Sequence, residues 1–220
     1  MTFPQIAAFG RKIPLAQLKS KGAPPKFSTW VRSVRWAYKL SPATFNLAAT
    51  PGVKEIEVLD VTLRAECKGG RTQALALEVL CRMIPNPCAF RLLDDDGQVM
   101  EEVVCPKASG GALFGDSPQY RLCRGHGVAE PDVLSGVTTL ESALVRWGAA
   151  LAGMSVREGE GILMFVERHY RLESLRADLA NLERKFGREV QLDRKYELAK
   201  ERLKLQHDIA ETGGSVEKRL

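Results

Sequence analysis

Two carboxylates and a lysine in the middle of the chain have the types that metal-dependent phosphodiester chemistry requires. Glu66-Cys67-Lys68 has the E-x-K form found in many restriction nucleases, which also need an upstream Asp to hold a divalent cation. Asp60 is the nearest upstream candidate, but it lies on the same predicted strand. An extended chain would separate the two carboxylates by about 20 Å. Solvated charges at a strand end account for this pattern better, and a small metal-dependent nuclease or toxin-like enzyme is the alternative interpretation.

Cysteine, histidine and aspartate also occur in patterns that can bind metal ions. Cys123-Arg-Gly-His126 has C-x-x-H spacing, which Cys88 and Cys105 would have to complete into a zinc site. The five cysteines include no C-x-x-C pair, and packed thiols are the simpler interpretation. The run 94–97, Asp-Asp-Asp-Gly, suits a hairpin turn better than a cation site. No P-loop, G-x-S-x-G or H-E-x-x-H pattern occurs, so we expect no catalytic residue, metal or cofactor.

The positive charge of the chain is concentrated at its N-terminal end. Residues 1–54 contain nine basic side chains and no acidic one, whereas the remainder carries 23 basic and 27 acidic residues. This asymmetry indicates a polyanionic partner, or else a basic segment that lies against an acidic body.

Four residues of this segment are the candidate nucleic-acid contacts. An apolar stripe containing Trp30, Val31 and Val34 predicts an amphipathic helix from about Ser28 to Lys39. Its opposite face would carry three cations around an aromatic ring, which can follow phosphates and stack on a base. The nucleic-acid candidates are Arg32, Arg35, Trp36 and Lys39.

A heptad pattern begins after residue 161 and predicts a coiled-coil arm over residues 162–211. Apolar residues recur at spacings of three and four, with an interruption near Gly187. A helical hairpin that turns between Gly187 and Leu192 fits this pattern, and one bent helix is the alternative. The arm either folds back onto the core or projects and pairs with a partner. The candidate partner-binding residues are Leu172, Leu175, Leu179, Leu182, Phe186, Tyr196 and Leu203.

The elements between these two ends predict an α+β core. A strand from Val53 to Glu66, a helix from Thr72 to Ile84, a hairpin over 88–105 and a helix starting near Thr138 follow in order. This order predicts a small, mainly antiparallel sheet packed with helices. The expected divisions are a basic segment over 1–54, the core over 55–153, a linker over 154–161, the arm, and a flexible tail over 212–220.

Five stretches of the chain have a recognisable order and spacing: Lys12-Ile13-Pro14, the run Trp36–Leu47, Val53–Val58, Ile84–Pro87 and Leu192–Lys195. Together they resemble an uncharacterised bacterial family, domain-of-unknown-function family 4391. The family has no established activity to carry over. The resemblance implies an association with restriction-type and helicase genes of bacterial defence clusters.

These observations favour a non-enzymatic accessory or adaptor subunit of an anti-phage or restriction-type system. Its arm would dock a protein partner, such as a helicase, methyltransferase or nuclease subunit, or a second copy of the chain. Its basic N-terminal helix would contact DNA or RNA. The start of the chain lacks the pattern of a signal peptide and no run of eighteen apolar residues occurs, so we expect a cytoplasmic protein without membrane contact.

Overall fold

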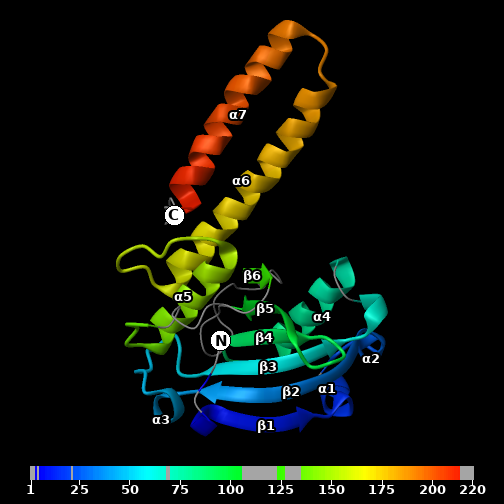
Figure 1. The fold of residues 1–220 in the computed structure, drawn as a ribbon, viewed down its shortest axis with the longest axis vertical. Coiled ribbons are helices and arrows are strands. Elements are labelled where there is room, and N and C mark those ends of the chain that lie inside the picture. Colours follow the sequence, from blue (N-terminus) through cyan, green and yellow to red (C-terminus); the bar gives the residue numbers. More distant parts are fainter. Residues whose placement is uncertain are drawn as a thin grey trace.

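The chain folds into a mixed β-sheet with helices on both faces and a helical hairpin that projects from one end (Figure 1). The computed structural model describes residues 3, 5–20, 22–67, 70–105 and 135–213, and the backbone of residues 123–126. Two short 3₁₀ turns, η1 (Gln5–Ala7) and η2 (Ala65–Cys67), lie outside the sheet. The α+β class predicted from the order of elements is confirmed.

Six strands lie in the sheet in the same order as in the sequence. They are β1 (Ala8–Ile13), β2 (Val31–Leu40), β3 (Ile56–Leu63), β4 (Cys88–Leu93), β5 (Val99–Cys105) and β6 (Cys123–His126). Four of the five neighbouring pairs are antiparallel, and β3 with β4 is the parallel pair. A parallel pair needs a crossover, and helix α4 (Gly70–Met83) supplies it.

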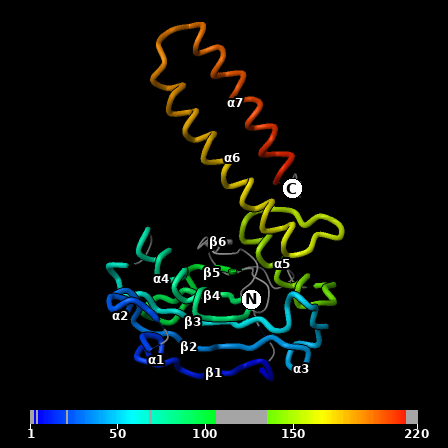
Figure 2. Tube along the Cα trace, turned by 180° about the vertical axis from the view of Figure 1, so that it is seen from behind, coloured from blue at the N-terminus to red at the C-terminus, as the bar shows by residue number. Residues whose placement is uncertain are grey.

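The sheet separates two hydrophobic cores, because side chains of a strand alternate between its faces. One core contains Leu59, Val61 and Phe90 under α4, together with the short helices α1 (Leu15–Ser20) and α2 (Phe27–Trp30). The other contains Ile56 and Val58 under α5 (Leu140–Ala152) and the start of α6. A further short helix, α3 (Pro42–Phe45), follows β2. Figure 2 shows the same layers from behind.

The helix predicted from Ser28 to Lys39 is wrong. Helix α2 ends at Trp30, and the rest of the segment is strand β2. The strand carries two register shifts, between Val31 and Ser33 and between Trp36 and Tyr38. Each shift inserts a residue and delays the alternation, as β-bulges do. Buried side chains therefore recur every third residue, which imitates the period of a helix.

The boundary expected at residue 54 is also absent from the fold. Strands β1 and β2 belong to the expected basic segment, yet they pair directly with β3 of the expected core. The N-terminal segment is thus one edge of the central sheet and no separate unit. The β4–β5 hairpin is as predicted: Asp94 Oδ1 accepts the backbone N–H groups of Asp96 and Gln98, and Gly97 has a φ of 81°.

Two long helices form the arm, as the heptad pattern predicted. Helix α6 (Ile162–Arg188) and helix α7 (Leu192–Gly213) pack side by side and turn at residues 189–191. The hairpin interpretation is therefore confirmed over the single bent helix. A helix of the length of α6 spans about 40 Å, and its outer half extends beyond the sheet (Figure 1).

Replacement of Trp147 by Phe tests the link between α5 and the sheet. The buried indole Nε1 of Trp147 donates to Glu102 Oε2 at 3.0 Å, and Glu102 is itself fully buried. Loss of this donor should lower the free energy of unfolding by about 1–3 kcal/mol in urea denaturation. Met100→Ala on the same strand as Glu102 is the control, since Met100 is exposed and should change stability by less than about 0.5 kcal/mol. Equal effects of the two substitutions would contradict the assigned role of this contact.

Candidate functional site

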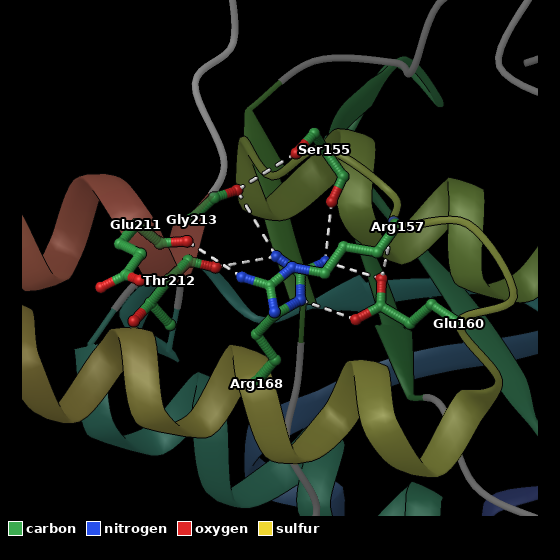
Figure 3. A network of polar contacts seen from close by, with 7 residues as sticks. All are labelled: Ser155, Arg157, Glu160, Arg168, Glu211, Thr212 and Gly213. Atoms are coloured by element: carbon green, nitrogen blue, oxygen red, sulfur yellow. Dashed lines mark hydrogen bonds and ion pairs between the residues drawn. The ribbon is translucent and has the colours of Figure 1, made fainter.

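The base of the arm is held by one buried guanidinium group, that of Arg168 on α6. Its nitrogens donate to both carboxylate oxygens of Glu160, at 2.6 and 2.7 Å, and to the carbonyl oxygen of Ser155 at 2.7 Å. They also donate to the carbonyl oxygens of Thr212 and Gly213, at 2.9 and 3.4 Å. Figure 3 shows Arg168 reaching between the loop before α6 and the end of α7.

These contacts satisfy the carbonyl groups that a helix leaves unpaired at its C-terminus. Arg157 contributes as well, because its side chain donates to the carbonyl oxygen of Glu211 at 2.9 Å. Two cations therefore meet the negative end of the α7 dipole. Residues 154–161, predicted as a linker, are packed against the arm, and α7 ends at Gly213 beside them. The rest of the predicted tail, residues 214–220, lies outside the described residues.

Glu160 is the counter-ion that makes this arrangement favourable. Burial alone would raise the pKa of its carboxyl group, but hydrogen bonds from Arg168 and from the backbone of Arg157 outweigh that effect and lower the pKa below its ordinary value. Both side chains of the pair are less than a tenth exposed. An ion pair buried to this degree is strongly destabilised when one partner is removed.

The heptad residues of α6 face α7 within the same chain. Leu172 and Leu182 are buried and Leu175, Leu179 and Phe186 are half-buried between the two helices, so these five candidates close the hairpin. On α7 the inward positions differ from the predicted ones: Leu198, Ala199, Arg202, Leu205 and Ile209 are half-buried. The guanidinium group of Arg202 lies over the ring of Phe186, 5.2 Å from its centroid.

Apolar side chains of α7 also face solvent. Tyr196 and Leu203, the two candidates on this helix, are each 63% exposed, and Leu192 is 82% exposed. Their spacing of four and seven places them on one helix face. Val190 in the turn adds a fourth exposed apolar side chain at the tip. We call Val190, Leu192, Tyr196 and Leu203 the outer stripe.

The four candidate nucleic-acid residues do not form one surface. Cross-strand pairing with Leu59 and Glu57 places Trp36 and Lys39 on the α4 face, whereas pairing with Asp60 places Arg35 on the α5 face. Arg35 Nε donates to the carbonyl oxygen of Gly10 at 3.2 Å. Arg32 lies at the other end of β2, where it pairs with Asp95 at 3.0 Å.

Lys39 contacts an acidic pair, Glu55 and Glu57, that the sequence interpretation did not single out. Its ammonium group lies 2.6 Å from Glu55 Oε2, and this hydrogen bond raises the pKa of Lys39. Asn86 Nδ2 donates to Glu55 and also to Glu57 Oε1, at 3.4 Å in the second case. Glu55 and Glu57 flank one residue at the start of β3, so the period of two puts both carboxylates on one face. This spacing was the signal in the sequence.

Glu57 is the more perturbed of the two carboxyl groups. It is only 3% exposed. Its pKa is raised from 4.5 to about 7, first by burial and then by the charge of Glu55 and a hydrogen bond with it, while Asn86 and Lys39 act in the opposite direction. Glu57 therefore exchanges a proton near neutral pH.

The two candidate nuclease carboxylates, Asp60 and Glu66, have different surroundings. Asp60 is engaged by Arg91, whose Nη2 lies 2.6 Å away, and Glu66 is exposed in the η2 turn after the strand. The side chains of Lys68, Cys123 and His126 lie outside the described residues. Cys88 and Cys105 join Cys81 instead: their three Sγ atoms lie within 4.8 Å of one another in the α4-side core. Burial, followed by hydrogen bonds with the other two thiols, raises the pKa of Cys81 and favours a neutral thiol.

The N-terminal half of the chain resembles a described family, as its sequence predicted. Residues 1–107 match the family model for "Domain of unknown function (DUF4391)". This range covers β1 to β5 with the acidic pair, whereas α5 and the arm follow it. No curated protein and no solved structure matches the chain. Among the described residues, no helix has both the length and the apolar character needed to cross a membrane.

Replacement of Arg168 by Met should release the base of the arm. The substitution leaves Glu160 buried without its counter-ion, and we expect a loss of about 3–5 kcal/mol in the free energy of unfolding. Arg176→Met on the same helix is the control, because Arg176 forms an exposed pair with Glu173 and should cost at most about 0.5 kcal/mol. The double variant Arg168→Met with Glu160→Gln should recover part of the loss. Urea denaturation followed by circular dichroism measures all three, and a loss no larger than the control would refute the role of Arg168.

The pKa of Glu57 predicts a distinct dependence of stability on pH. Between pH 4.5 and about 7 the folded state holds a proton on Glu57 that the unfolded chain has released, so stability decreases as pH rises through this window. Glu57→Gln removes the titration and should make the variant more stable relative to wild type at pH 8 than at pH 4, by about 2–3 kcal/mol. Glu173→Gln, at an exposed position, should parallel the wild type. Urea midpoints measured at pH 4, 6 and 8 provide the test, and parallel profiles for Glu57→Gln and wild type would contradict it.

Proposed function

We propose that this protein is a non-enzymatic accessory subunit whose projecting arm docks a partner protein through the outer stripe. The observation that carries the proposal is the division of apolar residues on α7. The inward-facing residues pack on α6, whereas Leu192, Tyr196 and Leu203 lie on solvent, although a helical hairpin needs only one apolar face. Aromatic and large aliphatic side chains that converge on one exposed face are typical of helix-mediated recognition.

Rigidity of the arm supports the same function. Arg168 and Arg157 fix both helices at the base, so the stripe is presented at a defined place relative to the core. Less conformational freedom is then lost when a partner binds. The charged residues around the stripe, including Lys200 over the ring of Tyr196, provide a polar rim.

The kind of partner is proposed from the family resemblance. We place the protein in the bacterial cytoplasm as a subunit of an anti-phage or restriction-type system, with a helicase, methyltransferase or nuclease subunit as the docked protein. A second copy of the chain is the other occupant to test. This context rests on the resemblance alone, since the matching family model is described only as a domain of unknown function.

Nucleic-acid contact through Arg32, Arg35, Trp36 and Lys39 is the second part of the proposal. Residues 1–54 contain nine basic residues and no acidic one, and this excess of positive charge supports it. Arg32 and Lys39 are engaged with Asp95 and Glu55, so phosphate contacts at the β1 edge would fall mainly to Arg35 and the exposed Arg11 and Lys12. A metal-dependent nuclease is the alternative function, and cleavage of nucleic acid with Mg²⁺ or Mn²⁺ that is lost on changing Asp60 or Glu66 would favour it.

Substitution of the outer stripe tests the docking proposal. The triple variant Leu192→Glu, Tyr196→Glu and Leu203→Glu should lose the partner, because charges placed on an apolar contact must be desolvated on binding. The measurement is co-purification of the tagged protein with the products of neighbouring genes, with sedimentation analysis of the protein alone to detect a second copy. We expect a loss of binding of at least about 100-fold for such a cluster of anchors.

Ala180→Glu is the control, since it introduces a glutamate at an exposed position of α6, away from the outer stripe. It should leave both co-purification and sedimentation as in the wild type. A partner that binds the triple variant as well as the wild type would refute docking through the outer stripe.

A further inference from the structure

A cavity of about 340 Å³ lies on the α4 face of the sheet, at the edge formed by β1. Strands β1, β2 and β3, helix α1 and the end of α4 surround it. Its size is that of a small-molecule site. Its walls are largely apolar and contain Ile13, Leu18, Leu59, Met83, Ile84 and Pro85.

Two buried polar atoms in this wall lack a hydrogen-bond partner among the residues that the structure describes. They are Nε1 of Trp36, a donor, and Oε2 of Glu57, an acceptor when the carboxyl group is ionised. Buried polar groups are almost always paired, and one left unpaired costs about 1–3 kcal/mol. A ligand that offers both an acceptor and a donor would satisfy the two atoms together.

The remaining polar groups define where charge is tolerated. Lys39 pairs with Glu55, and Asn86 donates to both Glu55 and Glu57. These contacts hold Glu57 in place. Arg11 of the exposed strand β1 pairs with Trp36, so its positively charged side chain lies on the cavity face, whereas Lys12 pairs with Arg35 on the opposite face. A ligand with an anionic end therefore fits with that end at Arg11 and its uncharged part inside.

We infer that this cavity binds a nucleoside 5′-phosphate. A nucleobase is planar, has apolar faces for the aliphatic walls, and carries donors and acceptors side by side on its edge. Trp36 Nε1 donates to a ring nitrogen or carbonyl oxygen of the base, and Glu57 Oε2 accepts from an amino or imino group. The phosphate lies at Arg11. The same chemistry is offered by a free mononucleotide and by the phosphorylated end of a single strand.

The site is independent of the proposed docking function. All of its lining residues fall between positions 11 and 86, within the range 1–107 that the chain shares with its family, whereas the outer stripe begins at Val190. Loss of one activity therefore leaves the other measurable. Binding of a nucleotide would also give the basic segment an anionic ligand without a contact from Arg32 or Arg35.

Titration calorimetry of the full-length protein with GMP, AMP, CMP and UMP tests the inference. At least one nucleotide should bind, and ribose 5-phosphate and inorganic phosphate should bind at least about tenfold more weakly, because they lack the base. Glu57→Gln should weaken nucleotide binding about tenfold or more, since it replaces a charged acceptor. Arg11→Ala should weaken binding and reduce its dependence on salt.

Trp36→Phe is the most specific variant, because it keeps an aromatic ring and removes only the donor and part of the surface. It should weaken nucleotide binding about threefold to tenfold. Trp30→Phe is the matched control, since Trp30 does not line the cavity, and it should bind as the wild type does. Far-ultraviolet circular dichroism verifies that each variant is folded. If Glu57→Gln does not fold, the result for Trp36→Phe decides the test.

A 5′-phosphorylated trinucleotide distinguishes the two sources of the ligand. Tighter binding of the trinucleotide than of any mononucleotide assigns the site to a strand end, and equal or weaker binding assigns it to a free nucleotide. The inference is overturned if none of these compounds binds. It is equally overturned if ribose 5-phosphate binds as tightly as the nucleotides, or if Trp36→Phe binds every nucleotide as the wild type does.

Discussion

The buried guanidinium group of Arg168 is the constraint on which the shape of the molecule depends. A helical hairpin must satisfy the carbonyl groups at the end of its second helix, and here the first helix supplies the donor. The same group is bound to Glu160 and to Ser155, which belong to the loop between α5 and α6. One side chain thus ties the two arm helices to the loop that follows α5, and the charge of Glu160 offsets the cost of burying it.

The sheet also keeps the many cations of the N-terminal segment apart from one another. Strand β2 shares its cations between the two faces and the ends of the sheet, so Lys39, Arg32 and Arg35 each meet a different oxygen ligand. The cations are thereby separated, which limits their mutual repulsion. This arrangement leaves Arg11 of β1, which pairs with Trp36, as a cation beside the cavity.

The predictable parts of the structure are those in which local pattern and tertiary packing agree. The Asp94–Gly97 turn, the heptad residues of α6 and the crossover helix α4 each have a periodicity or turn chemistry with a single solution. Strand β2 was misjudged because its bulges are determined by the neighbouring strands, which a single segment does not reveal. The outward position of Leu203 depended on the rotation of α7 against α6, since Arg202 is turned inward and Leu203, which was expected to face α6, is exposed. The cavity was the hardest to foresee, because Glu57, Trp36 and Asn86 come from three separate segments and their types alone do not indicate that they meet.

The tip of the arm has a consequence for how such a chain can vary. Both helices are fixed at the base, and residues 189–191 form a short turn with exposed side chains on either side. An insertion or deletion of seven residues in each helix preserves the inward pattern, because the hydrophobic repeat is seven residues long. Related chains are therefore free to differ in arm length by whole heptads while the sheet stays the same. The reach of the molecule, and so the distance at which it presents its stripe, is adjustable without any change to the core that carries it.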